Sequence, residues 1–399
     1  MEQNCIVWGA GNYGRRLIPI LTENGYTIKA FCDSNTKLTG VEGYKIISVE
    51  QAGKICSANR DLTVVIGIFD MAVVEEVKRT IKTEFPQNTK IQIGRDIQRS
   101  FENRMLLENY QKMIFRWKVN LEESFSVWLD HVMDEVEYHV RNDADCRGGM
   151  HEHFIRCRKN HAFTHRDVLR RVKAGDTVMD IGCGLALKYG EELESGGKVQ
   201  LVPVDALAHF YNILDGRIGG LKKDCRHRFG LFEFLGNQFG RNYADYIIIN
   251  NALDHCIDPW RSLVECLYVL KLGGRMYLNH KRAEAVYEGW TGLHKWNIDC
   301  FHGELLIWNK ENAVNVTEKL KEFAEVSVRY DDSIEIREDQ NIGVEIVKKR
   351  DFELSDFLDM HQENDILTKF IDKLMEKLAA DSGAFFRMLE QADFGETTV

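Results

Sequence analysis

The sequence predicts an α/β protein built from two doubly wound domains, with a helical connector between them and a helical segment at the end. Two segments share one pattern: an apolar strand, a glycine-rich turn, a helical stretch and a second strand that ends in an acidic residue. They run from Asn4 to Asp33 and from Asp176 to Asp205. Because this pattern opens the parallel sheet of a doubly wound domain, two copies of it predict two such domains.

Length, composition and charge agree with this architecture. The chain has 399 residues, which suits two domains of roughly 100–200 residues each. Hydrophobic residues make up 44% and charged residues 29%, as in ordinary globular proteins. The net charge of −10 disfavours nucleic acid as a partner, because an acidic surface repels phosphate.

Other features of the composition indicate the compartment. The ten cysteines form no CxxC pair, which favours a reduced chain over a disulfide framework. No apolar run reaches the roughly 18–20 residues that span a bilayer. The first residues also lack the basic and apolar stretches of a secretory signal. We therefore expect a cytoplasmic protein with no membrane partner.

The elements follow in order along the chain. The front domain is expected over 1–100, a helical connector that also packs on the second domain over 101–145, the second domain over 146–350, and a helical segment over 351–399. An apolar stripe on that last segment predicts a packing helix, and a homodimer helix is the alternative. The expected strands are Tyr44–Val49, Leu62–Ile68, Lys90–Ile93, Thr177–Ile181, Gln200–Val204, Tyr246–Asn250, Arg275–Asn279, Val326–Arg329 and Val344–Lys349.

The front domain carries a complete G-x-G-x-x-G pattern between a strand and a helix. The next strand ends at Asp33, at the distance of about 20 residues that a dinucleotide fingerprint requires. The candidate nucleotide-binding residues are Gly9, Gly11, Asn12, Tyr13, Gly14 and Asp33. The domain closes too early for a full nicotinamide-binding fold with two halves.

On these residues the front domain resembles small Rossmann-like domains fused to enzymes that modify nucleotide-linked sugars, including certain sugar acetyltransferases and C-methyltransferases. The resemblance implies that the glycine turn binds the nucleotide part of a sugar nucleotide. A scaffolding domain without a ligand and a domain that binds NAD both remain open.

A second glycine turn, Gly182-Cys183-Gly184, follows a buried strand that carries Asp180. The glycines let the backbone approach a ligand closely, and the helix expected after the turn would present its free N–H groups and positive dipole end. Asp205 ends the next strand, where its carboxylate can accept hydrogen bonds from ribose hydroxyls. A nicotinamide-binding turn and a turn that binds nothing are the alternatives at this point.

Further motifs follow in a fixed order over about residues 165–350: Asn251-Ala-Leu-Asp-His, Asp258-Pro259, and Val269-Leu-Lys-Leu-Gly-Gly. Together with the glycine turn and Asp205 they resemble class I S-adenosylmethionine (SAM)-dependent methyltransferases. The stretch 292–297 is similar to a subgroup from bacterial surface-polysaccharide and natural-product clusters. One departure is Ala186, where the family usually has a further glycine.

This resemblance implies SAM as the cofactor and assigns its contacts. Asp180, Gly182 and Gly184 would line the methionine end, with Cys183 between the glycines. Asp205, followed by Ala206, would hold the ribose. Asn251 would lie beside the transferable methyl group. Two residues would border the adenine, Glu233 and Phe234.

Methyl transfer to a hydroxyl also requires a base, and histidine is the usual one because its pKa is close to neutrality. The candidates are His255, His280 and His294, which follow the predicted strand ends, and Asp254 could orient one of them. Each histidine has a structural alternative, such as packing near the adenine or capping a helix. We expect at least one of them to assist proton removal.

A separate group of cysteines and histidines precedes the glycine turn. Cys157, His161 and His165 have the i, i+4, i+8 spacing of one helix face, which a zinc ion could use. The spacing matches no standard zinc signature, so we expect no metal here and favour a lid with Arg158 or His161 near the substrate. The group is Cys146, His151, His153, Cys157, His161 and His165.

The sequence therefore predicts a SAM-dependent methyltransferase that acts on a small-molecule acceptor, such as a hydroxyl of a sugar, a nucleotide-linked sugar or a related surface-polysaccharide group. An NAD(P)-dependent oxidoreductase built on the front domain is one alternative. A noncatalytic nucleotide-binding protein is another.

Overall fold

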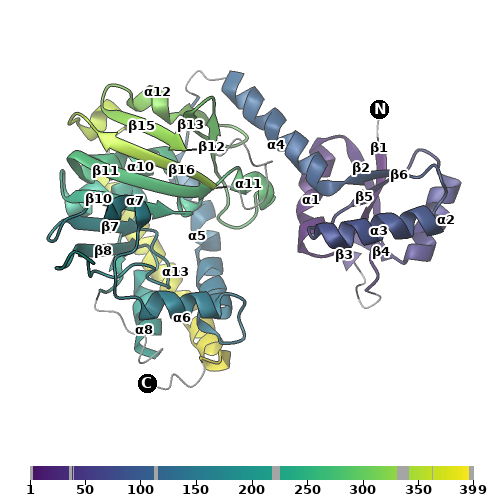
Figure 1. Cartoon of the computed structure of the whole chain (residues 1–399), viewed down its shortest axis with the longest axis horizontal. Helices are drawn as coiled ribbons and strands as arrows, with labels where there is room; N and C mark the ends of the chain where they lie inside the picture. The colour runs from purple at the N-terminus through teal and green to yellow at the C-terminus, as the bar shows by residue number, and fades with distance from the viewer. Residues whose placement is uncertain are drawn as a thin grey trace. The chain divides into compact units, whose positions relative to one another are not determined.

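The computed structural model describes residues 3–35, 38, 40–111, 116–217, 225–329, 341–361 and 363–394. The chain divides into two compact units, shown in Figure 1. The first unit is Met1–Gln111 with Ala285–Thr291, and the second unit is Lys112–Glu284 with Gly292–Val399. Among the described residues, no helix is long and apolar enough to cross a membrane.

The first unit contains a six-stranded sheet in the order β3-β4-β2-β1-β5-β6. All neighbouring strands pair in parallel except β3 and β4. The carboxyl-terminal halves of β1 and β2 and all of β5 are buried, because helices cover both faces of such a sheet. The strands are β1 (Gln3–Trp8), β2 (Tyr26–Cys32), β3 (Gly40–Val41), β4 (Tyr44–Ile47), β5 (Thr63–Ile66) and β6 (Lys90–Ile93). The helices are α1 (Asn12–Glu23), α2 (Val49–Ala58), α3 (Met71–Glu84) and α4 (Gly94–Gln111).

The second unit contains a seven-stranded sheet in the order β15-β16-β11-β10-β7-β8-β9. The strands from β11 to β9 are parallel, and β15 and β16 add an antiparallel edge. The strands are β7 (Thr177–Ile181), β8 (Gln200–Asp205), β9 (Arg228–Phe229), β10 (Ala244–Asn250), β11 (Leu270–Lys281), β15 (Ala324–Arg329) and β16 (Asn341–Lys348). The two sheets confirm the predicted fold class of two doubly wound α/β domains.

Helices surround the sheet of the second unit, and Figure 1 shows α10 and α13 among them. Asp258 begins α10 by accepting a hydrogen bond from the backbone N–H of Arg261, with Pro259 in the first turn. The helices are α5 (Leu121–Tyr138), α6 (His151–Lys159), α7 (Arg166–Leu169), α8 (Ala208–Arg217), α9 (Leu235–Phe239), α10 (Pro259–Val269), α12 (Val316–Leu320) and α13 (Glu363–Gln391). Shorter helices are η1 (His139–Ala144), η3 (Phe232–Phe234), η4 (Leu253–His255) and η5 (Leu354–Asp356), and α11 (Glu284–Tyr287) includes residues of both units.

The helix expected over 101–145 is divided. One part is α4, which ends at Gln111 in the first unit, and the other is α5, which begins after the N-cap Asn120 in the second unit. Helix α5 packs on α13 as part of one apolar cluster, and the rings of Phe125 and Phe370 stack with centroids 3.8 Å apart. The stripe predicted on the last segment is therefore a packing face within the second unit.

The helix predicted directly after Gly184 is wrong. Residues 182–192 form turns instead, and Leu187 has a positive φ of 47°. The backbone N–H of Gly190 donates to Ala162 O, and that of Glu192 donates to His161 O, at 2.9 and 3.0 Å. These hydrogen bonds hold the segment against residues 161–163, so tertiary pairing replaces the helix.

The sequence analysis also missed a three-stranded antiparallel sheet, β12-β13-β14, in the second unit. Its strands are β12 (Asn297–Phe301), β13 (Glu304–Trp308) and β14 (Ala313–Asn315). His302 and Gly303 join the first two strands with φ values of 50° and 81°. Positive φ at both central residues is typical of a two-residue hairpin turn, so Gly303 was the available signal.

Candidate active site

The second glycine turn lies where β7 ends, between the ends of β8 and β10. Ile181 of β7 pairs with Val204 of β8 and with Ile249 of β10, so these strands end at the same edge. Gly182 and Gly184 have φ values of 68° and 58°, which favour glycine. A Cβ on Gly182 would stand 2.4 Å from the Cβ of Ala252 and 3.0 Å from the ring of Phe232. The turn is thus packed closely and tolerates no side chain at this position.

Asp205 fixes the conformation of this turn. Its Oδ2 accepts a hydrogen bond from the backbone N–H of Gly184 at 3.1 Å, and its Oδ1 accepts one from Leu207 at 2.9 Å. Burial raises the pKa of Asp205, although both N–H groups oppose that shift. A carboxylate has about four lone-pair sites, so each oxygen retains capacity for a ribose hydroxyl. Ala206 follows directly and is half-buried.

The other predicted cofactor residues lie in a strand, in the glycine turn and after a strand end. Asp180 is buried in β7, and Cys183 lies between the two glycines. Asn251 follows β10 with a φ of 48°, and its Oδ1 accepts a hydrogen bond from the backbone N–H of Lys281 at 2.9 Å. The Asn251 side chain therefore ties together the ends of β10 and β11, at the edge where the sequence placed it.

The side chains of Glu233 and Phe234 are buried and contact other parts of the second unit. The Oε1 atom of Glu233 accepts hydrogen bonds from the backbone N–H groups of Ile257 and Asp258 at 2.8 and 3.2 Å. The ring of Phe234 is 2% exposed and lies edge-on to Phe370. Phe232, whose ring faces Gly182, is the neighbouring aromatic residue that borders the turn. The adenine contact assigned to Glu233 and Phe234 stays a prediction.

His139 is a residue of the site that the sequence analysis missed. Its ring atoms would lie 3.3–3.4 Å from a Cβ on Gly184, and its Nδ1 donates to Asp143 Oδ2 at 2.6 Å. Burial lowers the pKa of His139, but Asp143 outweighs it and the pKa is raised. The raised pKa favours the protonated ring, which would place positive charge beside the glycine turn. No sequence signal marked it, because His139 precedes the turn by more than forty residues.

The four predicted catalytic residues form one cluster around a buried carboxylate. Asp254 is fully buried in η4, and His280 lies in β11, one residue before its end. His280 Nε2 lies 2.9 Å from Asp254 Oδ1, and His294 Nδ1 lies 2.7 Å from Asp254 Oδ2. His255 Nε2 lies 3.1 Å from His294 Nδ1. The structure thus brings together residues that are up to forty positions apart in the sequence.

The charges in this cluster follow from its contacts. His280 Nδ1 donates to the carbonyl oxygen of Lys281 at 2.7 Å, and its Nε2 lies 2.9 Å from Asp254 Oδ1 and 3.4 Å from the backbone N–H of Asp254. Burial lowers the pKa of His280, but the Asp254 carboxylate outweighs it and the pKa is raised. Burial also raises the pKa of Asp254, while the histidines outweigh this and hold it well below its usual value. The surrounding histidines thus favour the ionised form of the Asp254 carboxylate.

The predicted nucleotide site of the first unit has the same design as the glycine turn of the second. Gly9 has a φ of 113°, and a Cβ on Gly14 would stand 1.9 Å from Gly9 O. Asp33 Oδ2 accepts the backbone N–H of Ala10 at 2.7 Å. Gly11 is the N-cap of α1, and Asn12 begins that helix.

Two further residues of the first unit border this turn through Tyr13. The hydroxyl of Tyr13 donates to Gln98 Oε1 at 2.8 Å, and its ring lies edge-on to Phe69. Phe69 is 45% exposed, and the guanidinium of Arg95 lies 5.2 Å from the centre of its ring. Phe69 and Arg95 follow β5 and β6, at the edge where doubly wound sheets bind ligands. The sequence analysis missed both.

The cysteines and histidines before the glycine turn do not share one helix face. Helix α6 ends at Lys159, so His161 and His165 lie beyond it. His165 is the N-cap of α7, and His151 contacts the carbonyl oxygen of Asp143. Cys157 lies 3.4 Å from His153, and Cys146 is exposed.

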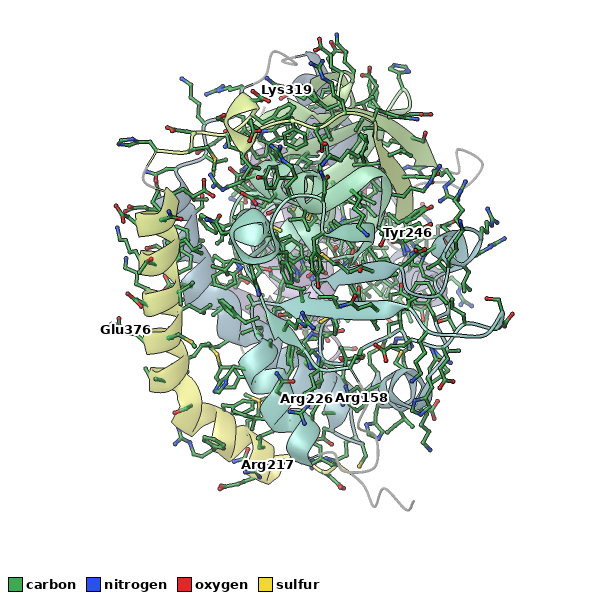
Figure 2. The ribbon with its side chains drawn as sticks, turned by 90° about the vertical axis from the view of Figure 1, so that its left-hand side faces the viewer. Arg158, Arg217, Arg226, Tyr246, Lys319 and Glu376 are labelled. Atoms are coloured by element: carbon green, nitrogen blue, oxygen red, sulfur yellow. The ribbon has the colours of Figure 1, made fainter. Side chains whose placement is uncertain are left out.

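Arg158 does not lie on the surface as a lid residue would. Its side chain is fully buried in an ion pair with Asp215, and it also donates to Leu185 O at 3.4 Å. Figure 2 labels Arg158 among the side chains of the second unit. His161 is exposed beside the turns of residues 182–192.

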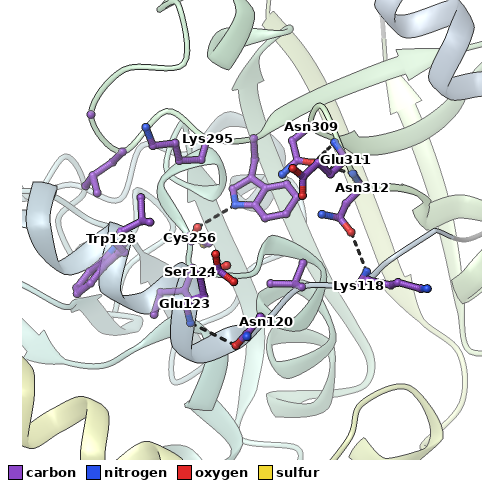
Figure 3. A pocket seen from close by; sticks show the side chains of 16 residues that line it. Lys118, Asn120, Glu123, Ser124, Trp128, Cys256, Lys295, Asn309, Glu311 and Asn312 are labelled. Carbon is purple, nitrogen blue, oxygen red and sulfur yellow. Dashed lines mark hydrogen bonds between the residues drawn. The ribbon is translucent and has the colours of Figure 1, made fainter.

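Figure 3 shows a pocket of about 240 Å³. Two of its lining residues are adjacent in sequence to histidines of the cluster. Cys256 and Lys295, which line it, directly follow His255 and His294. Trp296 donates its indole N–H to Cys256 O at 3.1 Å, and its ring stacks on Trp117. The lining combines indole rings with amides and charges: Trp128, Trp296, Asn120, Asn309, Asn312, Lys118, Glu123 and Glu311.

Comparison with known families gives two matches. Residues 4–80 match the PglD N-terminal domain, and residues 179–278 match the methyltransferase domain family. The second match covers β7 to β11, with the glycine turn, Asp205 and Asp254. It defines the second unit as carrying a methyltransferase domain, and it indicates SAM as the cofactor. A search of curated proteins found no match.

Solved structures that match part of this chain include the YcgJ protein from Bacillus subtilis, with 14% identity and a TM-score of 0.31 over 50% of this chain and 100% of that one. A SAM-dependent methyltransferase from Methanosarcina mazei has 17% identity and a TM-score of 0.30 over 48% and 100%. One from Archaeoglobus fulgidus has 13% identity and a TM-score of 0.32 over 51% and 96%.

Proposed function

We propose that this chain is a SAM-dependent methyltransferase that acts on a hydroxyl of a sugar or of a nucleotide-linked sugar. One observation carries the proposal. The glycine turn with Asp205 and the Asp254–histidine cluster follow neighbouring strands of one parallel sheet at the same edge. In doubly wound sheets, ligands bind at this edge where the strand order reverses.

The residues of the turn fit the cofactor. Asp205 can accept ribose hydroxyls while it holds Gly184, and the glycines expose backbone N–H and C=O groups. His139 supplies the positive charge for a methionine carboxylate that the absent helix cannot supply. When bound, the cofactor supplies a methyl carbon on a positively charged sulfur, which leaves with the electron pair of the bond that breaks.

The histidine cluster fits the removal of the proton from the acceptor. The acceptor oxygen forms the new bond to carbon, and its proton must pass to a base. His255 and His294 are only partly buried and can reach an acceptor, whereas His280 is buried. Asp254 stabilises the imidazolium that forms, as the aspartate of a catalytic triad does.

The acceptor class rests on two features. The pocket beside Lys295 combines indole rings with amides and charges, which suits a ligand that carries many hydroxyl groups. The first unit has a glycine turn, Asp33 and the exposed ring of Phe69 at one sheet edge, which suits a nucleotide with its base and phosphates. We therefore favour an acceptor that carries a nucleotide.

A crossed pair of matched variants tests the assignment of ligands to units. Asp205→Asn and Asp33→Asn each weaken the same kind of contact, an acid that accepts a turn N–H, in different units. We expect Asp205→Asn to weaken SAM binding by about 10–100-fold, since hydrogen bonds to charged groups contribute about 1.5–3 kcal/mol. Asp33→Asn should leave SAM affinity unchanged and weaken binding of a nucleotide-linked sugar.

Calorimetry with SAM, NADH and a panel of nucleotide-linked sugars gives the readout, and mass spectrometry of the products detects a gain of one methyl group. Wild-type protein that binds NADH but no SAM would overturn the proposal in favour of an oxidoreductase. Equal loss of SAM affinity in both variants would contradict the assignment to the second unit.

A further inference from the structure

Three potential ligand atoms converge on one point of the second unit: Asp254 Oδ2, His255 Nε2 and His294 Nδ1. The distances among them are 2.7 Å from Asp254 to His294, 3.1 Å from His294 to His255 and 3.5 Å from Asp254 to His255. Ligands bound at about 2.0–2.2 Å to zinc stand roughly 3.0–3.5 Å apart. Two of the three distances lie in this range, and the 2.7 Å contact between Asp254 and His294 would have to lengthen by a few tenths of an ångström to form one face of a metal centre.

Hydrogen bonding alone satisfies this triangle poorly. Two imidazole nitrogens and a carboxylate oxygen face each other, and only a proton on a nitrogen can bridge any two of them. A proton on His294 Nδ1 can bridge the 2.7 Å contact to Asp254, and His255 Nε2 then lies 3.1 Å from the same nitrogen. A cation at the centre accepts a lone pair from all three atoms at once.

Neighbouring residues contact the three candidate ligands and orient them for metal binding. His280 holds the other carboxylate oxygen of Asp254 at 2.9 Å, and the carbonyl oxygen of Lys281 fixes the His280 ring. Glu135 Oε1 lies 3.5 Å from His255 Nδ1, the ring nitrogen that would not bind the ion. Carboxylates and carbonyls behind histidine ligands are the usual outer contacts of metal sites.

A second grouping of the same kind, Asp254 with His280 and Glu284, is less suitable. Glu284 Oε1 already pairs with the Lys281 ammonium at 2.9 Å, and both ring nitrogens of His280 face acceptors. The first grouping is also reachable from outside: the side chains of His255 and His294 are 20% and 23% exposed, while that of Asp254 is 0% exposed.

We propose that Asp254, His255 and His294 bind one divalent transition-metal ion, such as zinc, at the end of β10. Imidazole and carboxylate ligands suit zinc and its neighbours in the series. Three protein ligands leave a position for an oxygen of the acceptor, as in catalytic zinc sites, and with the ion bound it would be the ion, in place of His255 or His294, that promotes loss of the acceptor's proton. That last clause rests on the proposed function, whereas the ion site itself does not.

The test measures binding of the metal alone to the full-length chain. Protein treated with a chelator is titrated with Co²⁺, whose bound form absorbs visible light, and Zn²⁺ is then added as a competitor. We expect one Co²⁺ per chain, displaced by Zn²⁺. His255→Ala and His294→Ala should each lower the affinity at least about 100-fold, because each removes a ligand.

Two more variants make the result specific. His361→Ala changes an exposed histidine outside the cluster and should leave Co²⁺ affinity unchanged. His280→Gln removes a group behind the ligands and should weaken Co²⁺ binding by about 10–100-fold. Circular dichroism confirms that each variant is folded. Wild-type protein that binds no Co²⁺, or that binds it equally after His294→Ala, overturns the proposal.

The two proposals fail separately. Calorimetry with SAM on the metal-free protein reports on the methyltransferase assignment without the ion. SAM binding without Co²⁺ binding overturns the metal site alone. Co²⁺ binding without SAM binding supports the metal site and overturns the proposed function.

Discussion

At the residue scale, the strand-end acids show what a sequence can and cannot reveal. Asp33 and Asp205 were predicted because each is an acidic residue at the end of the second strand of a strand–turn–helix–strand pattern. That each accepts an N–H from its own glycine turn was not predictable, since the hydrogen bond depends on the rotamer and on the turn. Glu233 shows the reverse: its position matched a motif, but its carboxylate serves the backbone before α10.

His165 gives a prediction for pH dependence. Burial lowers the pKa of His165 from its usual value of 6.5 to about 4, and its Nδ1 accepts the backbone N–H of Val168 at 3.3 Å. The unfolded chain therefore binds a proton on this residue below pH 6.5, whereas the folded protein does so only below about pH 4. Its contribution to stability is present above pH 6.5 and is lost as the pH falls toward 4.

His165→Asn tests this directly, because asparagine keeps an N-cap acceptor but does not titrate. The difference in unfolding free energy between wild type and variant should shrink by at most about 3.5 kcal/mol as the pH falls, at about 1.4 kcal/mol per pKa unit. Urea unfolding at several pH values measures it. A difference that stays constant with pH would contradict the prediction.

At the scale of elements, strands were predicted better than helices near the site. The apolar strands of both sheets are recognisable because burial on two faces leaves continuous runs of Val and Ile. The helix after Gly184 was not formed, since hydrogen bonds from Gly190 and Glu192 to residues 161–162 replace it. Those partners are distant in sequence, and periodicity alone cannot detect such competition.

The contact between α5 and α13 leads to a second prediction. Phe370 is buried against Phe125, whereas Phe386 on the same helix is 41% exposed. Phe370→Ala should lower the unfolding free energy of the second unit by about 3–5 kcal/mol, as buried phenylalanines do. Phe386→Ala, the matched control, should change it by less than about 0.5 kcal/mol. Chemical denaturation measures both, and equal effects would show that the stacked pair is not the anchor.

At the scale of the whole molecule, the two units should respond independently to a local lesion. A Cβ on Gly14 would meet Gly9 O at 1.9 Å, whereas nothing lies within 4 Å of a Cβ on Gly11. Gly14→Ala should destabilise the first unit by at least about 1–3 kcal/mol, and Gly11→Ala should have little effect. SAM should raise only the transition of the second unit, which identifies the two transitions in scanning calorimetry.

A shift of both transitions after Gly14→Ala would contradict this independence. Unchanged SAM affinity in the same variant would add support, because the glycine turn of the second unit is built from other residues.

The path of the chain sets a limit on dissecting this protein. Residues 285–291 belong to the first unit, yet they are inserted between His280 and His294 of the second. The first unit is thus formed by two segments that are not consecutive in the sequence. A fragment that ends at Gln111 would lack residues 285–291 of the first unit. The remaining fragment would still contain these residues, as a segment between His280 and His294 of the histidine cluster.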